Sequence, residues 1–242
     1  MELITDLVVA NRILATEDVV DAYGHVSARN PDAPERFFLA HSKSPSLVEA
    51  DDIVEHTLDG QALKKESRPL YLERFIHAAI YEARPEVMAV VHAHAEDVLP
   101  FTITKPALRP VIHSGAFIGA EVPVWDIADR FGELTNLLVT DIAQGRDLAK
   151  RLGANNVALM RGHGFAAAAR SLIDVVRMSV YLPRNARVQF KAMQLGEMKS
   201  LSAGEIQARS AGPGYKPQSP ETQRAWQYWA QRAGCADLLK QT

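Results

Sequence analysis

A mixed α/β fold is the class that the sequence predicts, and two observations lead to it. Apolar residues recur at helical spacing in several segments, while short β-branched runs bounded by glycine, proline or polar residues have the pattern of strands. The chain has 242 residues and is 47% apolar, which is enough for a sizeable core. Because linkers are short and no repeat is present, we expect one domain over residues 1–242 with a helical extension from about residue 205.

Composition and charge exclude several classes of function. The net charge is −2, with 27 basic and 29 acidic residues mixed along the chain, so no basic stripe is available for nucleic acid or an anionic membrane. The one cysteine, Cys235, cannot form an intramolecular disulfide. The amino-terminal residues lack the basic region of a signal peptide, and no long uncharged apolar run follows. We therefore expect a cytoplasmic protein that binds neither nucleic acid nor membranes.

The first part of the chain predicts a helix followed by three strands. Apolar residues from Leu3 to Leu14 recur at helical spacing, and this helix should end near Thr16. Three short segments then predict an antiparallel meander: Gly24–Asn30, Arg36–His41 and Ile53–Leu58. Polar residues at these strand ends and in the next loop are candidates for ligand contacts, although solvated strand ends and loops are the more frequent explanation. The candidates are His25, Ser27, Arg29, Ser42, Lys43 and Ser44.

A second helix is expected from Leu72 to Arg84, where Pro85 ends it. Glu73 would lie in the first turn of this helix. A carboxylate in that position interacts favourably with the positive end of the helix dipole, and this role alone is sufficient to explain the residue.

The stretch Val87–Phe101 contains an apolar run that ends in two histidines spaced i, i+2. The run has the length and β-branched content of a buried strand, and side chains two residues apart lie on the same face of a strand. His92 and His94 should therefore project together from the strand end. Neutral imidazole is the commonest metal ligand, so the pair indicates a metal site. Ordinary polar residues at a sheet edge would explain an isolated pair of this spacing equally well.

A third histidine lies in a turn between two predicted strands, Val157–Met160 and Phe165–Ala169. Glycines on both sides of His163 allow a sharp turn and leave room around the imidazole, which suits a metal ligand. We therefore select His163 as the third ligand. A turn that holds a histidine by chance would be the better explanation if His92 and His94 were absent.

The remaining segments predict further strands and helices. Short strands are expected at Val122–Trp125 and Leu137–Thr140, and a helix at Ile142–Leu152 should be closed by Gly153. A long helix should be capped by Ser171 and Asp174 and continue from Val175 to Leu201 with a kink at Pro183.

The C-terminal segment predicts one more helix. After a break at Gly212-Pro213-Gly214, Ser219 is a suitable N-cap with Pro220 at the first helical position. The aromatic tail that contains Trp226 and Trp229 should pack either on its own domain or on a neighbouring subunit.

These motifs together resemble the class II aldolase/adducin family over roughly residues 3–205. The resemblance rests on GHVSAR, LERFIHAAIYEARPEV, AVVHAHA and ALMRGHG followed by a long helix. It implies a three-layer α/β/α domain with a central, largely antiparallel sheet. It also implies that His92, His94 and His163 bind one divalent metal beside Glu73 as the acid/base, in a homotetramer with active sites between subunits. Adducin-like members lack the metal histidines and are structural proteins, so the three histidines favour an enzyme.

The sequence departs from the sugar-phosphate aldolases of this family where those enzymes bind phosphate. Their Asn in a GNxS motif, Ser-Gly pair and Ser-Ser pair are replaced here by His25, Lys43-Ser44-Pro45 and Tyr71-Leu72. A bulky tyrosine and an apolar leucine remove hydroxyl donors that a buried phosphate requires, so a sugar phosphate is a doubtful substrate. The tyrosine that aldolases use as a proton donor to the aldehyde is Ser114 here.

What remains resembles the branch that decarboxylates hydroxylated aromatic dicarboxylates. A divalent cation with three neutral ligands can chelate a substrate oxygen pair and stabilise the enolate that loss of carbon dioxide leaves. Glu73, protonated in the closed site, would deliver the proton to carbon, which requires burial to raise its pKa against the pull of the metal. Residues that would contact the hydroxy-carboxylate substrate, in addition to the candidates above, are Arg68 and Tyr71.

Two other functions stay open at this point. A metal-dependent aldolase or dehydratase acting on a non-phosphorylated hydroxy-acid would use the same histidines and acid. A non-enzymatic binding protein of the adducin kind would need neither. A site of three histidines suits zinc or manganese, and iron or cobalt are also compatible with it.

Overall fold

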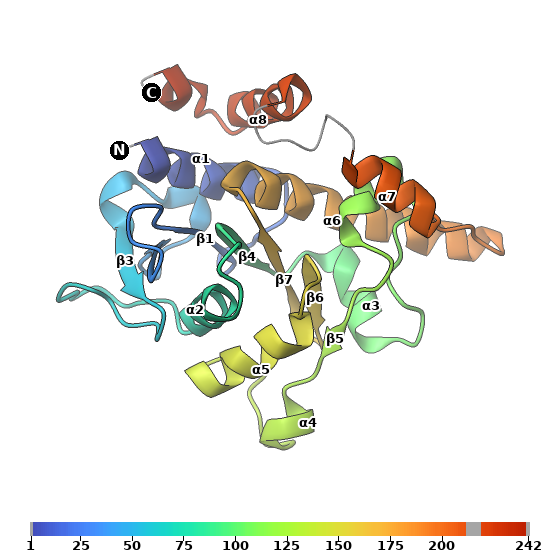
Figure 1. Ribbon diagram of the computed structural model, residues 1–242, viewed down its shortest axis with the longest axis horizontal. Coiled ribbons are helices and arrows are strands. Elements are labelled where there is room, and N and C mark those ends of the chain that lie inside the picture. The colour runs from blue at the N-terminus through green and yellow to red at the C-terminus, as the bar shows by residue number, and fades with distance from the viewer. Residues whose placement is uncertain (1, 212–218, 241–242) are drawn as a thin grey trace.

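The computed structural model describes residues 2–211 and 219–240 (Figure 1). Seven strands form one sheet in the order β3-β2-β1-β4-β7-β6-β5. Every neighbouring pair is antiparallel except β5 with β6, so the prediction of a largely antiparallel sheet and of an N-terminal meander is confirmed. The strands are β1 His25–Arg29, β2 Arg36–Ala40, β3 Ile53–Thr57, β4 Ala89–Ala93, β5 Val124–Trp125, β6 Val157–Met160 and β7 Gly164–Ala169.

Helices cover both faces of this sheet, which confirms the three-layer α/β/α arrangement. Figure 1 shows α1, α6 and α8 on one side, and α2 and α5 on the other. The described helices are α1 Glu2–Thr16, α2 Arg74–Ala83, α3 Leu99–Ile103, α4 Ala128–Phe131, α5 Ile142–Leu152, α6 Leu172–Leu195, α7 Ala203–Ala211 and α8 Pro220–Arg232.

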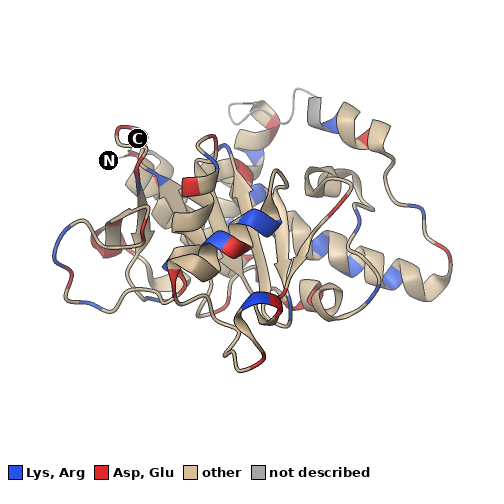
Figure 2. Cartoon of the chain, turned by 60° about the horizontal axis from the view of Figure 1, so that its bottom comes forward, with Lys and Arg blue, Asp and Glu red and all other residues tan. Residues whose placement is uncertain are grey.

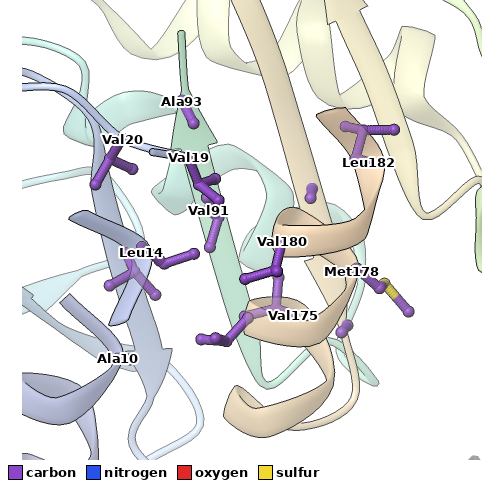
Figure 3. Close-up of a cluster of buried hydrophobic side chains, with 14 of the residues drawn as sticks. Ala10, Leu14, Val19, Val20, Val91, Ala93, Val175, Met178, Val180 and Leu182 are labelled. Carbon is purple, nitrogen blue, oxygen red and sulfur yellow. The ribbon is translucent and has the colours of Figure 1, made fainter. Parts of the chain in front are cut away.

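The sheet separates two hydrophobic cores because successive side chains of a strand point to opposite faces. On β4, Val91 belongs to the core under α1 and α6, together with Leu14 and Val175 (Figure 3). Its neighbour Val90 belongs to the other core, with residues of α2 and α5. His92 therefore shares the face of Val90 and is directed toward α2, the helix that follows Glu73.

The C-terminal helix packs on its own chain. Ser219 caps α8 by accepting a hydrogen bond from the Thr222 N–H, as predicted. Trp226 and Trp229 are buried in the core that α1 and α6 also line, and the Trp229 ring lies 6.0 Å from that of Tyr181 on α6. The sequence left two packing partners open for the aromatic tail, its own domain or a neighbouring subunit. In the structure the tail packs on its own domain. The predicted break at residues 212–214 lies outside the described residues.

Two sequence-based elements differ in the structure. The segment Leu137–Thr140 is not a strand: Leu137 has a left-handed φ of 64°, and the backbone of the segment bonds to site side chains instead of a sheet neighbour. The long helix α6 continues through Pro183 but ends at Leu195 rather than Leu201 because Gly196, at φ 135°, turns the chain away. Other predicted elements agree to within a few residues.

Surface charge is mixed. Figure 2 shows lysines and arginines interspersed with acidic residues, in keeping with the net charge of −2. Within residues 2–211 and 219–240, no helix combines the length and the apolar character that crossing a bilayer requires.

Candidate metal centre

Two neighbouring strands and one turn bring the three predicted histidines together. His92 lies near the end of β4 and His94 just beyond it, while His163 lies in the turn from β6 to β7, beside β4. Gly164 permits this approach, because a Cβ atom there would lie 2.1 Å from the Ala93 carbonyl oxygen. A glycine is therefore required at position 164, because the backbone there packs closely against the backbone of Ala93.

The imidazole Nε2 atoms of the three histidines converge. The Nε2 atom of His94 lies 3.0 Å from that of His92 and 3.1 Å from that of His163. Oε2 of Glu73 lies 3.2 Å from Nε2 of His92 and 3.4 Å from Nε2 of His163. One ligand atom from each of the four residues lies within 4.8 Å of every other.

The opposite ring nitrogens show which atoms carry protons. Nδ1 of His92 donates to the Phe165 carbonyl at 3.0 Å, and Nδ1 of His163 donates to the Leu137 carbonyl at 2.8 Å. Nδ1 of His94 lies 3.1 Å from a carboxylate oxygen of Asp21. A carbonyl or carboxylate can only accept, so each neutral ring keeps its proton on Nδ1 and has a bare Nε2.

This donor set fits a divalent metal. The bare nitrogen of His94 lies about 3 Å from those of His92 and His163, and such nitrogens repel one another unless a cation lies among them. Partners that hold the opposite ring nitrogen are typical around metal-binding histidines. Burial and then the neighbouring imidazoles of His92 and His163 lower the pKa of His94 to about 4, which keeps this ring neutral. His92 is fully buried, whereas the His94 side chain is 18% exposed, so the centre opens to solvent on the His94 side.

Glu73 faces the histidines and not its own helix. It precedes α2 as the N-cap residue, rather than lying in the first turn, and its side chain makes no capping hydrogen bond. Oε1 accepts a hydrogen bond from the Val139 N–H at 3.0 Å, while Oε2 is directed to His92 and His163. Burial would raise the pKa of Glu73, but positive charge on the imidazoles of His92 and His163, which protonation gives them when no metal is bound, lowers it well below its ordinary value. The carboxylate can serve as a fourth ligand or as a proton carrier beside the metal.

Two of the predicted substrate-binding residues border this centre. His25 is paired with His92 across β1 and β4, and their rings are 5.2 Å apart. The Tyr71 ring lies 4.5 Å from that of His25, and its hydroxyl donates to the Lys43 carbonyl. Tyr71 therefore offers the centre its aromatic ring, with the hydroxyl used to hold the loop.

The side chains of Ser27 and Arg29 form hydrogen bonds with other groups inside the protein. Both are buried, and they follow His25 along β1 away from the centre. The Ser27 hydroxyl lies between His77 and Tyr81, and the Arg29 guanidinium donates to the carbonyl groups of residues 34, 81, 84 and 87. These contacts place both side chains in hydrogen bonds within the protein, and their role in substrate binding stays a prediction.

Lys43 and Arg68 belong to an ionic cluster around Asp52, and Ser42 and Ser44 flank Lys43 in its loop. Lys43 Nζ lies 2.7 Å from Asp52, and Arg68 pairs with Glu66 at 2.7 Å. Burial would raise the pKa of Asp52, but hydrogen bonds from Lys43, the Glu49 N–H and His41 lower it to about 2. Ser42 is exposed, and the Ser44 hydroxyl lies 3.3 Å from that of Ser46. Substrate contacts by Lys43 or Arg68 would need these ion pairs to open.

Sequence reasoning missed two residues of the centre. Asp21, which orients His94, also accepts hydrogen bonds from the N–H groups of Tyr23 and Gly24, so an Asp before a turn glycine was the available signal. His77 lies on α2, four residues after the N-cap Glu73, a spacing that could have revealed it, and its Nε2 lies 2.7 Å from Nδ1 of His25. A cavity of about 610 Å³ borders Asp21 and His94.

Known proteins resemble this chain in sequence and in fold. The family model described as class II aldolase and adducin N-terminal domain matches residues 5–190. Decarboxylase tropJ of Talaromyces stipitatus is 39% identical, over 79% of this chain and 77% of that protein. A 3,4-dihydroxyphthalate decarboxylase of Arthrobacter keyseri is 27% identical, over 95% and 93% of the two chains.

Solved structures agree on the fold. An aldolase II superfamily protein from Pseudomonas syringae superposes with a TM-score of 0.78 at 21% identity, over 98% of this chain and 94% of that one. The sheet order, the position of the histidine cluster and these matches lead to one assignment. The chain belongs to the family of class II aldolases and adducin N-terminal domains.

Proposed function

We propose that this protein is a metal-dependent carbon–carbon lyase that decarboxylates a hydroxylated aromatic carboxylate. The observation that carries the proposal is the convergence of three bare imidazole nitrogens next to the Glu73 carboxylate. The names of two relatives, both decarboxylases, favour loss of carbon dioxide over aldol cleavage.

His92, His94 and His163 would hold the metal, with zinc or manganese as the first candidates. A bound divalent cation would supply a Lewis acid for the oxygens of an ortho-hydroxy carboxylate. Glu73 is placed to exchange a proton with the substrate carbon, because one oxygen is fixed by the Val139 N–H and the other faces the centre. Because Glu73 lies beside the imidazole nitrogens that would bind the metal, its carboxylate would be close to a substrate bound to that metal.

The surroundings support an aromatic substrate rather than a sugar phosphate. Tyr71 presents a ring, and its neighbour Leu72 is an apolar side chain that is 59% exposed. Neither residue offers a free hydroxyl where aldolases of the family provide one for phosphate, because the Tyr71 hydroxyl is already bonded to Lys43. A phosphate dianion at this place would lack donors, which is costly for a buried anion.

We expect carbon dioxide to be released when the metal-loaded protein is incubated with a panel of ortho-hydroxy aromatic mono- and dicarboxylates. Evolved carbon dioxide and the decarboxylated phenol are measured together, with chelated protein as the control. Release of an aldehyde from a hydroxy-acid without carbon dioxide would instead identify an aldolase. A metal-loaded protein that is inert toward both panels would contradict the proposal.

We also propose that the protein is a homotetramer with active sites between subunits. A subunit contact at this place would cover the exposed Leu72 beside Glu73 and the side of the centre that is open at His94. Light scattering at micromolar concentration should give a multiple of the 26.6 kDa chain mass. A mass equal to that of one chain would contradict this assembly.

A further inference from the structure

A buried chain of hydrogen bonds leads from the core to the edge of the metal centre. Nδ1 of His25 lies 2.7 Å from Nε2 of His77, and Nδ1 of His77 lies 2.6 Å from the Ser27 hydroxyl. The Ser27 hydroxyl lies 2.8 Å from that of Tyr81. All four side chains are at most 2% exposed. The metal ligands do not require this chain, since His92, His94 and His163 have other partners.

The direction of the chain is set by its inner end. The Tyr81 hydroxyl has one proton, and the acceptor that the described residues offer it is the Ser27 oxygen. Ser27 must then donate to Nδ1 of His77, and His77 must donate from Nε2 to Nδ1 of His25. Both rings stay neutral in this arrangement, in agreement with burial, which lowers the pKa of each well below its ordinary value. His25 consequently carries its proton on Nε2.

That proton is directed away from the core. Nε2 of His25 has no hydrogen-bond partner among the described residues and is not among their fully buried, unpartnered atoms, so it keeps a small exposed area in a side chain that is 2% exposed. The His25 ring packs between those of His92 and Tyr71, at 5.2 and 4.5 Å. The available donor therefore lies at the rim of the centre, where a ligand of the metal would be bound.

We propose that His25 donates its Nε2–H to an anionic oxygen of the substrate, and that His77, Ser27 and Tyr81 are positioning residues that hold it in this tautomer. The inference rests on the proposed function for the identity of the substrate. A carboxylate or phenolate oxygen needs a donor, and the opposite tautomer would present a lone pair to that anion. The buried hydroxyls thus decide whether the rim of the centre attracts or repels an anion.

The tautomer can be measured without any substrate. In zinc-loaded protein with ¹⁵N-labelled histidine, NMR should show His25 protonated at Nε2 and bare at Nδ1. Tyr81→Phe and Ser27→Ala remove the donors that set this state, so a mixture of tautomers is expected in both. Ser179→Ala is the matched control, because Ser179 is a fully buried serine on α6 whose hydroxyl lies outside the chain of bonds. A wild-type His25 protonated at Nδ1 would overturn the inference, whatever the protein catalyses.

The donated hydrogen bond is tested with salicylate, an ortho-hydroxy carboxylate. His25→Phe keeps an aromatic ring but removes the donor, and should weaken salicylate binding to the zinc-loaded protein by about 10-fold or more, as expected for a hydrogen bond to a charged group. Zinc content is measured on the same samples and should not change. Equal salicylate affinity in wild type and His25→Phe would refute the donor role. Failure of the wild type to bind salicylate would count against the proposed substrate class, while the NMR result would still decide the tautomer.

Discussion

Replacing His92 and His94 together by alanine should reduce the metal content from one ion per chain to background and abolish turnover. The physical reason is that two of three converging nitrogens are lost, and the remaining His163 cannot hold a divalent ion with Glu73 alone. Metal content is measured by elemental analysis on the purified variant after loading and desalting. Since catalysis depends on the bound cation in the proposed reaction, activity and metal should disappear together.

Two controls make this result interpretable. His92 is fully buried, so its replacement also leaves a cavity, and the single variant His94→Ala, at a partly exposed position, separates metal loss from unfolding. His113→Ala removes an exposed histidine outside the cluster and should keep the metal. Stoichiometric metal in the folded double variant would show that the binding site is somewhere else in the protein.

Glu73→Gln should keep the metal and lower turnover by roughly 100-fold to 10,000-fold, the usual contribution of a positioned general acid or base. Glutamine has nearly the same shape and can still accept the Val139 N–H, but it cannot exchange a proton. If Glu73 served only the helix end, the change would remove about 0.3–1 kcal/mol of stability and leave turnover intact. The absence of a capping hydrogen bond from this side chain argues against that simpler role.

Metal content and turnover must be measured on one sample of Glu73→Gln. Glu82→Gln is the matched control, because Glu82 lies on α2 but pairs with Arg146 at the surface and should not affect either quantity. A Glu73→Gln protein with its metal and most of its activity would refute the assignment, and water, His25 or His113 would then have to provide the proton. A protein that loses its metal would identify Glu73 as a ligand instead.

The cluster of three histidines was predictable because its signals are local. His92 and His94 follow from the two-residue period of a strand, and His163 follows from the glycines on either side of it. The position of Glu73 was harder to predict, because interaction with the helix dipole is enough to explain a carboxylate at a helix end. Only the fold shows that Glu73 faces the histidines. Its role in proton transfer stays a prediction.

Two other features of the structure were not predictable, for a different reason. Arg29 looked like a polar residue at a strand end, but the sheet places it against carbonyl groups more than 50 residues away in the sequence. The segment Leu137–Thr140 has the composition of a strand, and its actual course depends on contacts with Glu73 and His163. Non-local hydrogen bonds of this kind leave no periodic trace in the sequence.

The main chain of the segment from Leu137 to Val139 contacts both the histidine cluster and Glu73. The Leu137 carbonyl accepts from His163, and the Val139 N–H donates to Glu73. Because every residue except proline has both groups, relatives can change side chains here without altering either contact. The same arrangement couples the two side chains mechanically, because any shift of this short stretch displaces His163 and Glu73 together. The distance between them is therefore set by the backbone and does not depend on particular side chains in this segment.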